Sequence, residues 1–106
     1  MEVKEIRSEG EFETAINRGG VMLMDFNAPW CAPCHSQEPI IERLAGQFQG
    51  KASIVAMNVD ENQEVAMKLG IYGIPTIIIF KNSKEVQRFV GLQPEAALSE
   101  ALEKLL

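Results

Sequence analysis

Two kinds of hydrophobic run alternate along the chain. Nearly continuous runs of apolar residues are typical of strands covered on both faces, and they occur at 21–26, where Asp25 is the exception, 53–59 and 77–80. Elsewhere, apolar residues recur three or four positions apart. This spacing predicts four helices that each bury one side, with apolar stripes at 12–16, 40–48, 65–69 and 97–105. Short extended pieces at 3–6 and 85–90 complete the predicted order β-α-β-α-β-α-β-β-α.

This order predicts an α/β fold. Strands that alternate with helices form a parallel sheet through right-handed crossovers, with helices on both faces. The turn predicted at 81–84 adds a hairpin, so the sheet should be mixed. The chain has 106 residues, a length that fits one domain over 1–106.

Polar residues mark the expected ends of two helices. Ser8 stands three residues before Glu11, the spacing of a capping box, and Gly19-Gly20 is expected to end that helix. Asp60 and Asn62 are the predicted caps of the helix that follows the second long strand.

The charge balance limits the classes of partner. The chain carries 10 Lys and Arg against 15 Asp and Glu, a formal net charge of −5. This acidity argues against nucleic acid or an anionic membrane as the main partner. No apolar run approaches the roughly 20 residues that span a bilayer, and the first residues lack the layout of a secretory signal. We therefore expect a cytoplasmic protein, and nothing in the sequence indicates more than a monomer.

Cys31 and Cys34 are the two cysteines of the chain, and they follow directly on a buried strand. Positions three apart on a helix share one face, so the two sulfurs can lie close enough for a disulfide. Cys31 falls at the helix start, where free amides and the helix dipole favour a thiolate, and Pro33 fits the first turn. Cys34 lies one turn deeper and should be less exposed. Cys31 is therefore the expected nucleophile, and Cys34 the residue that resolves the mixed disulfide.

Metal binding is the rival chemistry for these thiols. A structural zinc site uses four ligands, usually from two Cys or His pairs. Here Cys31, Cys34 and His35 are contiguous and no second pair follows. We expect no metal and no bound cofactor, with the Cys31–Cys34 disulfide as the redox group. Two inert buried thiols are a further alternative, which Pro33 and the helix start disfavour.

The chain resembles the thioredoxin family over nearly its whole length. The resemblance rests on Trp30-Cys31-Ala32-Pro33-Cys34, Asp25-Phe26, Pro39, Val59-Asp60, Gly73-Ile74-Pro75-Thr76 and Gly91. It implies a thioredoxin fold, with a central mixed sheet of five strands flanked by four helices. It also implies reduction of disulfide-containing proteins, with electrons supplied by an NADPH-dependent flavoprotein, thioredoxin reductase.

The resemblance implies a substrate-binding role for residues around the cysteines. Pro75 corresponds to the family's cis-proline, which would leave the backbone of Ile74 free to pair with an extended substrate and would keep metals away from the thiols. Trp30 would provide a flat contact surface, and Gly73 and Gly91 would leave room for the substrate backbone. The alternatives are a trans proline, core packing of Trp30 and ordinary turn glycines.

Asp25 corresponds to the family's buried acid. A carboxyl group in an apolar strand should have a raised pKa and could exchange a proton with Cys34; the alternative is an aspartate open to solvent. Many members place a lysine where this chain has Ala56, so we expect a more strongly raised pKa for Asp25. Asn27 replaces a frequent aromatic residue, which is expected to loosen packing or to change partner choice.

Three residues beside the thiols are candidates for tuning their redox properties: Ala32, Pro33 and His35. Ala32 stands where the family usually has glycine and should stiffen the turn, with a modest effect on the redox potential. His35 replaces a common Lys or Arg. Because histidine as a residue type changes charge near neutral pH, this replacement predicts pH-sensitive reactivity. A solvated surface histidine is the alternative.

Two other functions remain open at this point. One is an oxidant or isomerase of exported proteins, although those relatives usually carry a polar or basic residue between the cysteines and an export signal. The other is a thioredoxin-like binding subunit that uses the apolar surface around Trp30, Ile74 and Leu92.

Overall fold

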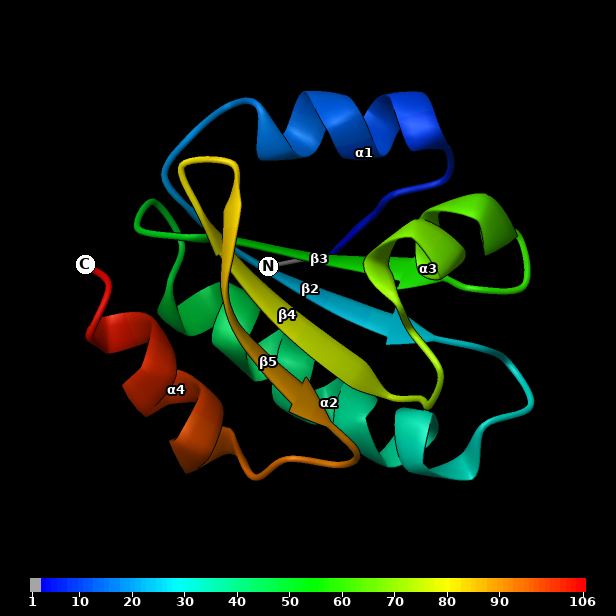
Figure 1. Cartoon of the computed structure of the whole chain (residues 1–106). Helices are drawn as coiled ribbons and strands as arrows, with labels where there is room; N and C mark the ends of the chain where they lie inside the picture. Colours follow the sequence, from blue (N-terminus) through cyan, green and yellow to red (C-terminus); the bar gives the residue numbers. More distant parts are fainter. Residues whose placement is uncertain (1–2) are drawn as a thin grey trace.

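A computed structural model describes residues 3–106 of the chain, and its elements follow the predicted order (Figure 1). The strands and helices are β1 (Lys4–Glu5), α1 (Glu9–Ile16), β2 (Val21–Asn27), α2 (Ala32–Gln47), β3 (Ser53–Asn58), α3 (Gln63–Leu69), β4 (Thr76–Lys81), β5 (Lys84–Val90) and α4 (Glu95–Glu103).

The five strands form one mixed sheet in the order β1-β3-β2-β4-β5. β3 pairs in parallel with both β1 and β2, whereas β4 runs antiparallel to both β2 and β5. This confirms the predicted mixed sheet with its closing hairpin. β2 lies at the centre, and Asp25 is placed in register with Ala56 on one side and Ile77 on the other.

Helices cover both faces of the sheet, α1 and α3 on one face and α2 and α4 on the other (Figure 1). Successive side chains of β2 therefore enter two different cores. Leu23 packs with residues of α2 and α4, such as Leu44 and Leu98, whereas Met24 packs with Phe12 of α1. Coverage of both faces explains the consecutive apolar residues in the strands. Because side chains alternate along a strand, Asp25 shares the face of Leu23 and is directed towards the α2 side.

The first helix begins as predicted and ends earlier. The Glu11 amide donates to Oγ of Ser8 at 3.1 Å, and the Glu11 carboxylate accepts from the Arg7 amide at 2.9 Å. The prediction that Gly19-Gly20 ends the helix is wrong, because the C-cap is Asn17. α1 stops at Ile16, and the glycines instead form a left-handed connection to β2, with φ values of 79° and 74°.

The capping of α3 also differs from the prediction. Asn62 occupies the N-cap position, but its side-chain amide donates to the Asn58 carbonyl and makes no capping bond. The amides of Asp60 and Glu61 are satisfied by Oδ1 of Asn58, at 2.8 and 3.2 Å. The last residue of β3 therefore organises the turn, because its side chain reaches the backbone two and three residues ahead.

Candidate redox site

The two cysteines form a disulfide at the N-terminus of α2, with 5.2 Å between their Cα atoms. Cys31 is the N-cap residue, Pro33 lies in the first turn, and the amide of Cys34 donates to Sγ of Cys31 at 3.2 Å. A backbone donor and the positive end of the helix dipole therefore both point at the sulfur of Cys31. Both stabilise negative charge, so this arrangement favours a Cys31 thiolate once the disulfide is reduced.

The expected difference in exposure between the two cysteines is not present. Each is 4% exposed in the disulfide form. Both belong to a small cluster with Ala28, against which Ile74 and Val59 pack. The two sulfurs are thus distinguished by their position on the helix, because Cys31 precedes the first turn whereas Cys34 is already part of it.

Trp30 lies directly before the disulfide with its indole on the surface. Its side chain is 70% exposed, and Nε1–H donates to Oδ2 of Asp60 at 2.8 Å. This exposure rules out core packing as the reason for the tryptophan. The hydrogen bond fixes one edge of the ring, and the ring remains available for contact.

The Ile74–Pro75 peptide bond is cis, as the resemblance implied. The Pro75 carbonyl accepts from the Gly91 amide at 2.8 Å, which joins the start of β4 to the end of β5. Within the described part of the chain, the N–H and C=O of Ile74 have no hydrogen-bond partner. Gly91 has a φ of 96°, which explains a glycine there, whereas Gly73 has an ordinary φ and room for a Cβ atom.

Asp25 is 2% exposed, and burial raises the pKa of its carboxyl group to about 7. The polar side chain of Asn27 lowers this pKa, whereas the negative charges of Glu38 and Glu5 raise it further. Oδ1 of Asp25 has no hydrogen-bond partner among residues 3–106. Asp25 is therefore a buried acid that changes protonation near neutral pH, and not an aspartate open to solvent.

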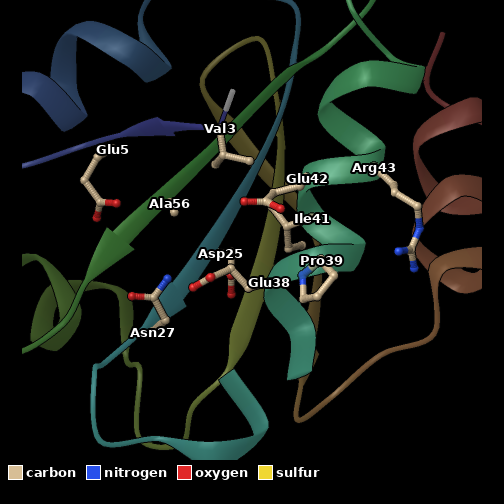
Figure 2. Close-up of a pocket in the computed structure, with 10 residues that line it drawn as sticks. All are labelled: Val3, Glu5, Asp25, Asn27, Glu38, Pro39, Ile41, Glu42, Arg43 and Ala56. Carbon is tan, nitrogen blue, oxygen red and sulfur yellow. The ribbon is translucent and has the colours of Figure 1, made fainter. Parts of the chain in front are cut away.

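An acidic groove of about 710 Å³ leads to Asp25. Its lining includes Glu5, Glu38 and Ala56 (Figure 2). Ala56 is the residue of β3 that lies beside Asp25 of β2, and its side chain is small. Arg43 contributes the positive charge of this lining, but it extends away from Asp25 and pairs with Glu95 at 2.7 Å (Figure 2). With alanine at position 56, no cation from β3 faces the buried acid to offset the burial of its carboxylate.

A second hollow, of about 400 Å³, reaches Cys34 and His35. It shares Asn27 and Glu38 with the groove at Asp25, so the two hollows adjoin behind the disulfide. Asn27 occupies the position where thioredoxin-like sequences often have an aromatic residue. It lines both hollows, between Asp25 and Cys34.

The three candidate tuning residues lie in the first turns of α2. Ala32 and Pro33 are exposed next to the disulfide. His35 is also exposed, but its ring is tethered: Nε2 lies 2.6 Å from the Pro29 carbonyl and donates to it. The His35 amide donates to the Cys31 carbonyl at 3.2 Å. His35 therefore connects the helix to the loop that carries Trp30.

The sequence predictions omit two polar residues of α2 near the site. Glu38 follows Cys34 by four positions, and this helical spacing was a usable signal for placing its charge near the buried acid. Gln37 gave no such signal, because its partner is Gln93, 56 residues further along the chain.

Neither a membrane span nor a metal site is found in the described part of the chain. Across positions 3–106, no helix has the length and apolar character needed to cross a bilayer. The same residues contain no group of three or more His, Cys, Asp or Glu side chains arranged to hold a metal ion.

Comparison with known proteins decides the family. The family model described as Thioredoxin matches residues 3–104. The chain belongs to the thioredoxin family. It is 43% identical to a thioredoxin of Staphylococcus epidermidis over 99 residues, which cover 93% of this chain and 94% of that protein. It is 46% identical to a thioredoxin of Staphylococcus saprophyticus over 89 residues, 84% of this chain and 86% of the other.

Solved thioredoxin structures share the fold. A mutant thioredoxin from Halobacterium salinarum superposes with a TM-score of 0.91 at 36% identity, covering 98% of this chain and 90% of that one. A Plasmodium falciparum thioredoxin superposes with a TM-score of 0.90 at 32% identity, covering 98% of this chain and all of that one. Family membership and the Cys31–Cys34 disulfide together identify a thiol–disulfide oxidoreductase that acts as a protein-disulfide reductase.

Proposed function

We propose that Cys31 attacks the disulfides of substrate proteins, that Cys34 resolves the resulting mixed disulfide, and that Asp25 accepts the proton of Cys34. The observation that carries this assignment is the hydrogen bond from the Cys34 amide to Sγ of Cys31 at the helix start. It supports ionisation of Cys31 and not of Cys34, which sets the order in which the two sulfurs react.

In the first step, the Cys31 thiolate attacks one sulfur of a substrate disulfide. The substrate S–S bond breaks, an intermolecular disulfide forms, and the other substrate sulfur leaves as a thiolate that takes a proton from water. An extended substrate would pair with the free backbone groups of Ile74, as in strand addition, and contact the exposed ring of Trp30. Because the positive φ of Gly91 favours glycine, this position contributes no side chain to the neighbouring surface.

In the second step, the thiol of Cys34 loses its proton and attacks the sulfur of Cys31. The mixed disulfide breaks, the substrate leaves with two reduced sulfurs, and the Cys31–Cys34 disulfide remains. The pKa of Asp25, raised by burial to about 7, supports Asp25 as the group that takes this proton, because an ordinary aspartate is too weak a base. The adjoining hollows behind the disulfide support a proton path past Asn27.

Regeneration of the dithiol needs two electrons from outside the chain. We assign this to thioredoxin reductase, as family membership suggests, which gives the protein a role in electron transport. We further propose that the chain works as a single domain over 1–106, in the cytoplasm, as a monomer and without a bound cofactor. Gel filtration with light scattering tests the monomer, and fractionation of cells tests the location.

Two serine variants test the roles of the cysteines. Cys31→Ser should abolish the reduction of insulin disulfides by dithiothreitol-charged protein. Cys34→Ser should also stop turnover, but it should accumulate mixed disulfides with substrates, which non-reducing electrophoresis detects. Each variant is the matched control of the other. Accumulation of mixed disulfides by Cys31→Ser instead would reverse the assignment.

The direction of electron flow is tested by the redox potential. Equilibration with a glutathione buffer should give a value near the roughly −270 mV of thioredoxins, whereas an oxidant would lie near about −120 mV. A value near that of oxidants would favour action on exported proteins. If the double cysteine-to-serine variant still supported the cellular role, the protein would act as a binding subunit.

A further inference from the structure

Gln37 is the one polar residue among the buried positions of α2, whose other members are Cys34, Ile41, Leu44 and Ala45. Its side chain is completely buried. Nε2 donates to the Gln93 carbonyl at 3.0 Å, and Oε1 accepts from the Gln93 amide at 2.7 Å. Both ends of one side-chain amide thus pair with the backbone of a single residue, as a neighbouring strand would.

Gln93 belongs to the segment 91–93, which connects β5 to Pro94, the N-cap residue of α4. Its other end is held separately, because the Gly91 amide donates to the Pro75 carbonyl at 2.8 Å. Leu92, between these two anchors, has a half-exposed side chain. Both anchoring residues, Pro75 and Gln37, are close in sequence to residues of the disulfide site. Pro75 follows Ile74, which packs against the cysteines, and Gln37 lies one helical turn after Cys34.

A buried glutamine in an apolar stripe is costly unless its polar atoms are paired, so an apolar residue would suffice if packing were its task. The pairing with Gln93 gives the polar side chain a different purpose. It fixes the backbone of segment 91–93 relative to the helix that carries the thiols, and with it the position of the half-exposed Leu92.

We propose that Gln37 is a positioning residue that holds segment 91–93 for the recognition of protein substrates, and that it does not act on the thiols themselves. This inference rests on the proposed docking of substrates across Trp30, Ile74 and Gly91. It predicts that Gln37 affects the reaction with a folded protein disulfide, and that the reaction with a small disulfide, too short to reach Leu92, is left unchanged.

Gln37→Met tests this, because methionine has similar length and volume and removes both hydrogen bonds. The reduced protein is mixed with insulin or with dithiodipyridine, a small disulfide, and single-turnover rates are followed. The rate with insulin should fall about fivefold or more, since the loss of one hydrogen bond of ordinary strength already corresponds to that factor, and the rate with dithiodipyridine should not change. Gln47→Met is the matched control: it removes the hydrogen bond from Gln47 to Ser99 on the same helix, away from the site, and should change neither rate.

Two further measurements separate positioning from a general structural effect. Hydrogen exchange of the Gln93 amide should be faster in Gln37→Met and unchanged in Gln47→Met. Leu92→Ser should slow the reaction with insulin in the wild-type background and add little in the Gln37→Met background, because the segment is then already displaced. Gln37→Leu also removes both hydrogen bonds, should give the same loss with insulin, and provides a second variant if Gln37→Met does not fold.

Equal slowing with both disulfides would overturn the proposal, since Gln37 would then act on the thiols. If the wild type reduces insulin and Gln37→Met reduces it at the same rate, the proposal is also overturned, and the proposed function is left intact. Fully additive effects of Gln37→Met and Leu92→Ser would show that segment 91–93 is not the intermediary. A wild-type protein that does not reduce insulin would overturn the proposed function, and this inference with it.

Discussion

Asp25→Asn should stabilise this protein at alkaline pH and have almost no effect at acid pH. The carboxyl group is 2% exposed, and burial raises its pKa from 3.8 to about 7. Between these two values the folded protein holds a proton that the unfolded chain has released. The free energy of unfolding therefore falls as the pH rises, by about 1.4 kcal/mol for each pH unit from this group.

The full penalty follows from the two pKa values. Below about pH 4 the carboxyl is protonated in both states and costs nothing, whereas above about pH 7 the folded state must bury a carboxylate, at about 4 kcal/mol. Asparagine resembles the protonated acid in shape and carries no charge. We therefore expect Asp25→Asn to raise the free energy of unfolding by about 4 kcal/mol at alkaline pH and by little at about pH 4.

Urea unfolding of the disulfide form, followed through the fluorescence of Trp30, measures this difference at about pH 4 and about pH 8. Glu64→Gln, which removes an exposed carboxylate on α3, is the control and should show the pH dependence of the wild type. Equal stability of Asp25→Asn and wild type at both pH values would refute the reasoning, because it would mean that the buried carboxyl titrates as it does in the unfolded chain.

Two more predictions concern the surroundings of Asp25 and the frame of the sheet. Glu38→Gln should lower the pKa of Asp25, because a negative charge that raises it is removed. Asn27→Ala should raise this pKa, because the polar side chain that lowers it is removed. Carbon-detected NMR titration of the Asp25 carboxyl measures both shifts, and shifts in the reverse directions would contradict the assigned causes. Arg88→Met should lower the free energy of unfolding by about 2 kcal/mol, because Arg88 satisfies the Leu69 and Gly70 carbonyls at the end of α3 and pairs with Glu85. Urea unfolding measures this loss, and Arg88→Lys, which keeps the charge and loses the planar fork of donors, should lie between Arg88→Met and the wild type.

The order of elements and the position of the disulfide could be predicted because both depend on local spacing. Helical periodicity, the Ser8 cap and the placement of Cys31 at a strand-to-helix junction each involve residues within one or two turns of one another. Hydrophobic runs covered on both faces likewise reveal strands before the partners of those strands are known. The same local reasoning failed at α3, where Asn58, Asp60 and Asn62 offered competing polar side chains and only their packed arrangement selects Asn58.

The environment of the site depends on contacts between residues far apart in the chain, which no local pattern encodes. Burial raises the pKa of Asp25, as the apolar strand around it predicted, but the further rise from the charges of Glu38 and Glu5 depends on two other elements that only the fold brings close. Gln37 could not be recognised as a partner of Gln93, because a glutamine in a helix has the same sequence signature whether it faces water or a distant backbone. Local spacing therefore determines which groups are available, whereas long-range packing determines which of them meet and how strongly burial changes their chemistry.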